Sequence, residues 1–155
     1  MALLPILTGE NNPVLRTKTK KVPKMTKELV KVLQDMIDTT IGAKGAGIAA
    51  PQVNRSERIC IALIGGVLTP LVNPEITWRS EEIDVLEEGC LSLPSVWLPV
   101  PRSTSIVLAY KTQEWKDMER KLQAFDARVV QHEVDHLEGK LIVDYRITQP
   151  ATSGR

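Results

Sequence analysis

The chain has 155 residues, of which 43% are hydrophobic, enough for one domain with a substantial core. Its 20 basic and 19 acidic side chains leave a net charge of +1, which argues against direct binding of DNA through a basic surface. No apolar run approaches the roughly 18 residues of a membrane-spanning helix, and no signal-peptide pattern is present, so we expect no membrane partner.

The N-terminal part of the chain predicts an extended arm followed by a helix. Residues 1–24 form the arm, which Val14 and Leu15 are expected to anchor on the core. Thr26 is a suitable N-cap, and apolar residues recur at helical spacing after it. This first helix should end near Thr40, before a glycine.

The segment GAGIAAPQ, from Gly45 to Gln52, combines two glycines with small residues. Such a composition indicates a backbone that passes close to another group. One interpretation is a tight connection between a helix and a strand. The other is a backbone that lies along a ligand, with the amide of Gln52 available to it. The segment by itself favours the first interpretation.

The middle of the chain has the residues of antiparallel strands and their turns. Turns are predicted at Gly65-Gly66 and at Asn73-Pro74, and residues 111–120 are predicted to form a hairpin tip. The predicted strands are residues 58–63, 67–72, 74–78, 83–86 and 105–110.

The two cysteines are too few for a disulfide scaffold, so a reducing, cytosolic compartment is expected. Cys60 lies in an apolar strand and is predicted to be buried and inert. Cys90 lies between Gly89 and Ser92 in the segment EEGCLSLP and is predicted to be an exposed thiol. The prolines that follow should keep the next segment extended.

The only two histidines, His132 and His136, lie in the segment QHEVDHLEG. Residues four apart lie on the same face of a helix, so both imidazoles can reach one metal ion. Glu133 lies beside that pair, where it can act as general base on a metal-bound water. A helix from Phe125 to Glu138, stopped by Gly139, would place these residues opposite a core-packing stripe. That stripe consists of Ala127, Val130, Val134 and Leu137.

A catalytic metal site needs a third protein ligand and one open position. No histidine follows His136, and the downstream carboxylates of Glu138 and Asp144 are badly placed. The thiol of Cys90 is the remaining good candidate. One cysteine and two histidines would suit Zn²⁺, Fe²⁺, Co²⁺ or Ni²⁺.

Three segments together resemble the three motifs of the peptide deformylase family. They are GAGIAAPQ, EGCLS and QHEVDHLEG, and their order and spacing also match that family. The resemblance covers the chain from the arm to Asp144. It implies an α+β fold, with antiparallel β-sheets around a central HExxH helix and one helix near the N-terminus. We expect one catalytic domain over residues 1–155, with residues 148–155 as a frayed tail.

The resemblance also implies a role for particular residues. The metal ligands would be Cys90, His132 and His136, and Glu133 would be the general base and acid. Gln52 and the backbone N–H of Leu91 would stabilise the oxyanion. Gly47 and Gly89 would hold the peptide as an added strand. The methionine pocket would involve Ala46, Glu88, Phe125, Val129 and His132, with Glu88 paired to Arg102.

The family removes the formyl group from the N-terminal formyl-methionine of nascent polypeptides and releases formate. Its metal is usually Fe²⁺, and Zn²⁺, Ni²⁺ or Co²⁺ often replaces it. The implied partners are N-formylmethionyl nascent peptides, with the ribosome as the place of encounter. The implied location is the cytoplasm of a bacterium or a phage-infected cell, with an organelle as the alternative.

Two residues depart from the pattern of many bacterial members. Trp97 stands where these often have a polar or basic residue, and Arg128 stands where they have an apolar one, although the organellar-type branch resembles this chain there. Both departures concern peptide preference. Two other functions remain as alternatives: a small HExxH metalloprotease, and a non-catalytic metal-binding module. Glu133 and an open fourth position argue against the module.

Overall fold

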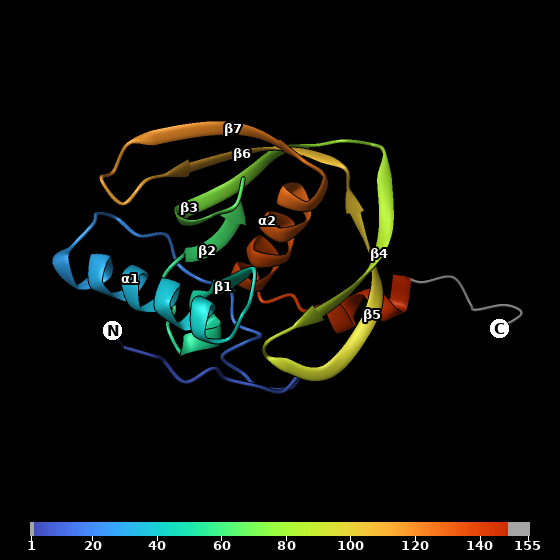
Figure 1. The fold of residues 1–155 in the computed structure, drawn as a ribbon, viewed down its shortest axis with the longest axis horizontal. Helices are drawn as coiled ribbons and strands as arrows, with labels where there is room; N and C mark the ends of the chain where they lie inside the picture. The colour runs from blue at the N-terminus through green and yellow to red at the C-terminus, as the bar shows by residue number, and fades with distance from the viewer. Residues whose placement is uncertain (1, 149–155) are drawn as a thin grey trace, which may run out of the picture.

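Helix α2 (Ala124–Leu137) lies between two antiparallel sheets in the computed structural model, which describes residues 2–148 (Figure 1). The five-stranded sheet has the order β1-β2-β3-β6-β7. Its strands are β1 (Gly47–Ala49), β2 (Ile59–Ile64), β3 (Val67–Arg79), β6 (Ser105–Lys111) and β7 (Asp117–Gln123). The second sheet is a hairpin of β4 (Ile83–Cys90) and β5 (Leu93–Ser103). The expected α+β class is therefore confirmed.

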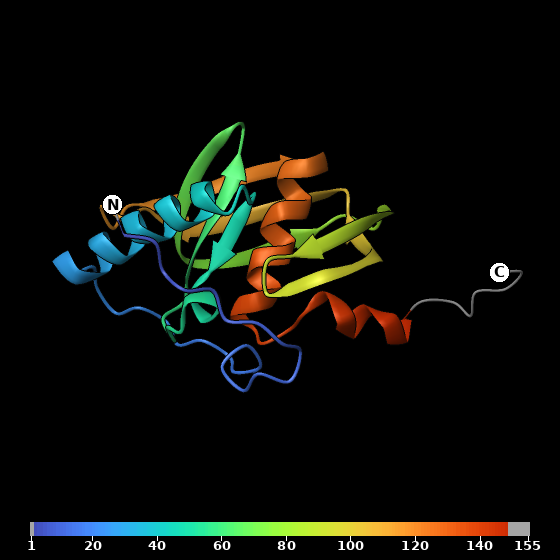
Figure 2. The ribbon, with the colours of Figure 1, turned by 60° about the horizontal axis from the view of Figure 1, so that its bottom comes forward.

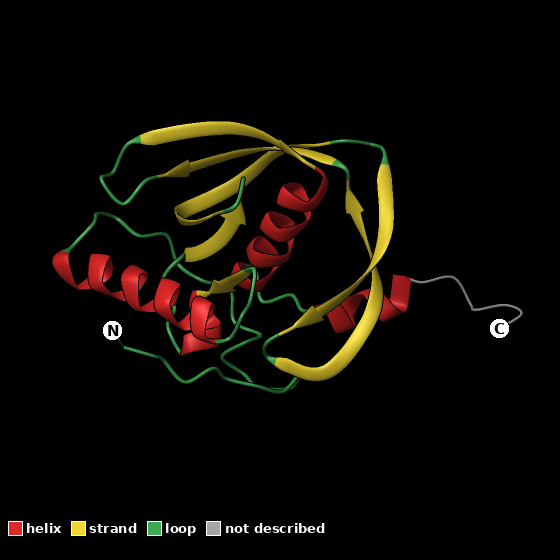
Figure 3. Cartoon of the chain, in the orientation of Figure 1, coloured by secondary structure: helices red, strands yellow, loops and turns green. Residues whose placement is uncertain are grey.

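Helix α1 (Lys27–Gly42) lies on the outside of the molecule (Figure 3). The Thr26 hydroxyl accepts a hydrogen bond of 3.1 Å from the Leu29 N–H, which confirms the predicted N-cap. The apolar stripe of α1 packs in one cluster with β1 and β2, through residues such as Leu33, Ile48 and Ile61. The helix ends two residues beyond the predicted end, at Gly42.

Helix α2 has the two faces that its sequence predicts. The residues of the predicted core stripe are all buried, at 0–5% exposure, and pack against the five-stranded sheet. Its start and end each differ by one residue from the prediction. Gly139 follows it with φ of +77°, a conformation that favours glycine and confirms the predicted stop. The opposite face therefore remains available for a site.

The predicted turn at Asn73-Pro74 is wrong, because β3 continues through both residues. The register against β6 shifts between Val72 and Glu75, and Asn73 has φ of +51°. This is a β-bulge, a position where a strand tolerates a proline without losing a ladder hydrogen bond. The Asn73 amide further binds both the N–H and the carbonyl of Val22 in the arm.

The structure has more strand than the sequence predicts between residues 83 and 103. β4 extends four residues beyond the predicted end, as far as Cys90, and β5 accommodates three prolines because it pairs with β4 alone. The hairpin after β6 turns within a few residues at Trp115, whose φ is +67°, and then continues as β7. The hairpin predicted over residues 111–120 is therefore present, but its tip is shorter than predicted because β7 already begins at Asp117.

Past helix α2, a 3₁₀ segment, η2 (Ile142–Thr148), runs beneath the β4–β5 hairpin (Figure 2). The apolar residues Leu141, Ile142 and Val143 are buried at 1–5% exposure. They pack with Leu15 of the arm and with apolar residues of β5, in a cluster separate from the α2 core stripe. Residues 149–155 of the expected frayed tail lie outside the described residues. No helix within residues 2–148 is long and apolar enough to cross a membrane.

Candidate metal centre and active site

Two neighbouring elements bring the three predicted metal ligands together. Helix α2 carries His132 and His136 one turn apart, with their ring centroids separated by 5.0 Å. Cys90 ends strand β4, and its Sγ lies 3.3 Å from Nε2 of His136. One ligand atom from each of the three residues lies within 4.8 Å of the other two. This spacing brings one sulfur and two nitrogen donors to a common point.

The surroundings of these donors fit a divalent metal ion. Oε1 of Glu133, beside these donors, is buried and has no hydrogen-bond partner among residues 2–148. Nitrogen and thiolate donors suit Zn²⁺, Fe²⁺, Co²⁺ or Ni²⁺, and three protein ligands leave a fourth position for water or substrate. The buried carboxyl of Glu133, next to His132 in the helix, would be placed to act on such a water.

The imidazole of His132 is oriented by Glu88. Nδ1 of His132 lies 2.9 Å from Oε1 of Glu88. Burial by itself raises the pKa of Glu88, but hydrogen bonds from His132 and Arg102 outweigh it and hold this pKa well below the usual range. The ionised carboxylate therefore accepts the Nδ1 proton, which leaves the lone pair of Nε2 for the metal.

The surroundings shift the pKa values of the two imidazoles in opposite directions. Burial lowers the pKa of His136 well below its usual value, and His132 lowers it further. Burial acts in the same direction on His132, but hydrogen bonds to Cys90 and Glu88 outweigh it and raise the His132 pKa to about 10. A metal ion bound by the same atoms would supply positive charge in place of the proton.

Glu133 lies beside the ligands and is itself buried, with 4% of its surface exposed. Burial raises the pKa of its carboxyl to about 7, against the lowering influence of His132 and Arg102. A carboxyl with a pKa near neutrality can both accept and return a proton. Strand β1 faces it closely, since a Cβ atom on Gly47 would lie 2.6 Å from Glu133 Oε2.

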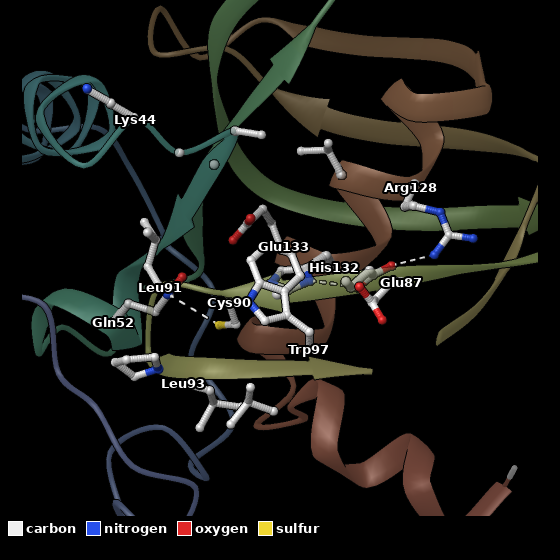
Figure 4. Close-up of a pocket in the computed structure, with 18 of the residues that line it drawn as sticks. Lys44, Gln52, Glu87, Cys90, Leu91, Leu93, Trp97, Arg128, His132 and Glu133 are labelled. Atoms are coloured by element: carbon white, nitrogen blue, oxygen red, sulfur yellow. Dashed lines mark hydrogen bonds and ion pairs between the residues drawn. The ribbon is translucent and has the colours of Figure 1, made fainter. Parts of the chain in front are cut away.

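The amide of Gln52 points toward the metal ligands (Figure 4). Its Oε1 accepts a 2.9 Å hydrogen bond from the Ala49 N–H, which fixes which way the amide faces. Its Nε2 then donates to the hydroxyl of Ser92 at 3.0 Å and lies 3.9 Å from Cys90 Sγ. Leu91 follows Cys90 in the turn between β4 and β5, so both predicted oxyanion donors lie beside the ligands.

A cavity of about 540 Å³ opens over this cluster. Every residue predicted for the methionine pocket lines the cavity, and so do both glycines predicted to hold the peptide backbone. They are Ala46, Glu88, Phe125, Val129 and His132, with Gly47 and Gly89. The predicted pair of Glu88 and Arg102 is present as well, with a distance of 2.9 Å from Nε to Oε2.

Ser92 has no role in the sequence-based prediction, and Trp97 and Arg128 appear there only as departures that concern peptide preference. Ser92 binds Gln52, Trp97 covers Gly89, and Arg128 binds Glu88 at the cavity wall. The proximity of Ser92 to Cys90 in the sequence was a usable signal. Trp97 reaches the site because it pairs with Gly89 across the β4–β5 hairpin, and the sequence had not predicted that pairing. Figure 4 shows its indole in front of Cys90 and His132.

A family model described as polypeptide deformylase matches residues 3–151. The protein named peptide deformylase of Thermotoga maritima is 41% identical over 133 residues, which are 86% of this chain and 81% of the relative. The protein of that name from Dictyoglomus thermophilum is 42% identical over 139 residues, covering 89% of this chain and 90% of the relative.

Solved structures share the fold as well. The crystal structure of peptide deformylase from Thermotoga maritima matches with a TM-score of 0.89 and 38% identity, covering 93% of this chain and 97% of that one. The structure of a probable peptide deformylase from synechococcus phage S-SSM7 matches with a TM-score of 0.86 and 38% identity, covering 92% and 99%. The actinonin-bound class I type b peptide deformylase of Acinetobacter baumannii matches with a TM-score of 0.88 and 35% identity, covering 93% and 98%.

Proposed function

The chain belongs to the polypeptide deformylase family, and from this premise we propose that Cys90, His132 and His136 bind its metal while Glu133 transfers the proton. The reaction is removal of the formyl group from the N-terminal formyl-methionine of nascent polypeptides, with release of formate. The observation that carries the residue assignment is the convergence of one sulfur and two nitrogen donors within 4.8 Å, beside a buried carboxyl.

Cys90, His132 and His136 would hold a divalent ion, whose Lewis acidity would acidify water and polarise the formyl carbonyl. Glu133 accepts the proton of the attacking water and then donates it to the departing amine nitrogen. Its pKa of about 7, raised by burial, makes both transfers accessible near neutral pH. The C–N bond of the formamide breaks, and the products are formate and a free N-terminal amine.

The negative charge that develops on the formyl oxygen needs hydrogen-bond donors in fixed positions. We assign this role to Nε2 of Gln52 and the backbone N–H of Leu91. The hydrogen bond from the Ala49 N–H to Gln52 Oε1 supports the assignment, because it holds the donor end of the amide toward Cys90. Preorganised donors stabilise the transition state without the cost of reorienting during the reaction.

The cavity supports binding of the peptide as an added strand, with the methionine side chain inside. Gly47 and Gly89 both line the cavity and bring no side chain between it and their own backbone. Ala46, Phe125 and Val129 supply apolar surface for the methionine. The close approach of Gly47 to Glu133 leaves little room beside the formyl hydrogen, so the methyl of an acetyl group should be rejected sterically.

Fe²⁺ is the native metal that we propose, and the donor set also accepts Zn²⁺, Ni²⁺ or Co²⁺. We further propose that residues 1–155 act as one catalytic domain in the cytoplasm, on nascent chains at the ribosome. Metal analysis of protein prepared without oxygen addresses the first proposal. Sedimentation with ribosomes that carry formylated nascent chains addresses the second.

The reaction assignment is tested with three peptides that differ only at the N-terminus: formyl-Met-Ala-Ser, acetyl-Met-Ala-Ser and unblocked Met-Ala-Ser. The metal-loaded protein should release formate from the first, leave the second unchanged and cleave no peptide bond in the third. Cleavage of a peptide bond in the unblocked peptide would instead favour the metalloprotease alternative. The absence of formate release would contradict the proposed assignment.

A further inference from the structure

Arg128 is a buried cation at the wall of the cavity. It lies on helix α2 one turn before His132, so the two side chains share a face of the helix. Its side chain is only 8% exposed and lines the cavity beside Val129. A buried guanidinium is stable only where acceptors match its donors, and its partners therefore show what it holds in place.

Each terminal nitrogen of Arg128 has two acceptors. One donates to Glu88 Oε2 at 2.6 Å and to the Val100 carbonyl at 2.9 Å. The other donates to Asp84 Oδ1 at 2.6 Å and to the Asp84 carbonyl at 3.1 Å. The guanidinium thus connects helix α2 to both strands of the β4–β5 hairpin, and Figure 4 shows it directed into the cavity wall.

Glu88 is the point where these contacts meet the metal centre. Its Oε1 faces Nδ1 of His132 at 2.9 Å and also accepts from Arg102 at 2.9 Å. Its Oε2 accepts from Arg102 on the strand side and from Arg128 on the helix side. One carboxylate is therefore held between two guanidinium groups while it orients a metal-binding imidazole.

The two arginines have different consequences for His132. Arg102 belongs to strand β5, and its remaining nitrogen binds Asp135 and Tyr145. Arg128 and His132 belong to the same helix, so their common partner Glu88 is fixed relative to the imidazole by one rigid element. Mutation of a residue that orients a ligand in this way typically lowers metal affinity or activity about 10–100-fold.

We propose that Arg128 is a positioning residue for the metal centre, which holds Glu88 so that His132 keeps the orientation of a ligand. The inference rests on the proposed ligand set. The positive charge of Arg128 is balanced locally, because the carboxylates of Glu88 and Asp84 both form ion pairs with it. An ion-pair network therefore accommodates the buried guanidinium at the cavity wall.

The test measures how fast a chelator removes Co²⁺ or Zn²⁺ from the protein, which requires no turnover. Arg128→Met keeps the length of the side chain but removes every donor, and it should release the metal about 10–100 times faster than the wild type. Arg128→Lys should fall between the two, because one ammonium can reach Glu88 but cannot reproduce the planar fork. The Co²⁺ absorption spectrum should shift in the same order.

Arg58→Met is the matched control. Arg58 is also buried and ion-paired, to Glu138, but it touches none of the three ligands or Glu88. It should lower the melting temperature while leaving the rate of metal release near that of the wild type. Release from Arg128→Met at the wild-type rate would overturn the proposal, and so would equal acceleration in Arg58→Met.

If Arg128→Met fails to fold, Arg128→Lys decides the matter alone, and metal release at the wild-type rate from this variant overturns the proposal. Failure of the proposed function gives a different result, because wild-type protein would then bind no divalent ion or release no formate. The chelator measurement on a wild-type protein that binds metal therefore separates the two.

Discussion

The backbone of Gly47 approaches Glu133 so closely that a Cβ atom at position 47 would lie 2.6 Å from Oε2 of the carboxylate. The same Cβ would also lie 2.7 Å from the carbonyl oxygen of Ile61, which belongs to the neighbouring strand and cannot move freely. Strand β1 therefore sets the position of the proposed proton-transfer group, and glycine is the residue that this contact permits.

Gly47→Ala should displace the Glu133 carboxylate and lower formate release by about 10²–10⁴-fold, the range associated with a general base. Gly42→Ala is the control, since a Cβ there would lie 3.4 Å from a Leu3 methyl carbon, an ordinary contact. Steady-state formate release by both variants, with metal content measured alongside, checks the prediction. Normal turnover by Gly47→Ala would show that Glu133 tolerates displacement.

Cys90→Ala should lose most of the bound metal, whereas Cys60→Ala should keep it. Cys90 Sγ lies 3.3 Å from His136 Nε2, while Cys60 is fully buried in the core and burial raises the pKa of its thiol well above the usual value. Elemental analysis after removal of unbound metal distinguishes the two variants. Full metal occupancy in Cys90→Ala would require a different third ligand.

Much of this site could be predicted because its signals are local. The spacing of His132 and His136 and the apolar stripe that includes Val134 lie in one helix, so helical periodicity was enough. The scarcity of other donors then pointed to Cys90, and the motif resemblance gave roles to residues of other elements, such as Gln52 and Leu91.

Features that depend on strand pairing could not be predicted in the same way. The bulge at Asn73 looks like a turn because an Asn-Pro pair has the same local preference in both. Trp97 reaches the cavity through its register with Gly89, and Arg128 binds carboxylates and carbonyls that only folding brings to it. No local pattern carries that information.

Gln52→Leu should lower kcat by roughly 10²–10³-fold, the usual effect of losing one oxyanion donor. The variant should keep its metal, because Nε2 of Gln52 lies 3.9 Å from Cys90 Sγ and is not a ligand. It should also melt at a lower temperature, since the Ala49 N–H loses its buried acceptor at a cost of about 1–3 kcal/mol. A change in KM alone would identify Gln52 as a ground-state contact instead.

Asp144→Asn should make stability less sensitive to acid. Burial raises the pKa of Asp144, but hydrogen bonds from Arg16 and the Leu141 N–H outweigh this and lower the pKa below its usual value. A carboxyl with a lowered folded-state pKa stabilises the protein above its unfolded-state value of about 3.9, and the stabilisation disappears as pH falls through the folded-state pKa.

The variant should therefore be less stable than the wild type at pH 7 by about 1 kcal/mol or less, since the Arg16–Asp144 pair is partly exposed to solvent. The difference should shrink as the pH falls below about 4. Urea unfolding of both proteins at several pH values measures it. A difference that stays constant between pH 7 and pH 3 would mean that the ion pair with Arg16 contributes nothing.

The assignment of Glu133 as the group that moves the proton is tested most directly by formate release from formyl-Met-Ala-Ser in Glu133→Ala, with bound metal measured in the same sample. Glu133 is not one of the three converging ligands, so the variant should keep wild-type metal content. Its turnover should fall by about 10²–10⁴-fold, because the water and the leaving amine lose their proton carrier. Near-normal turnover with full metal content would contradict the proposed mechanism.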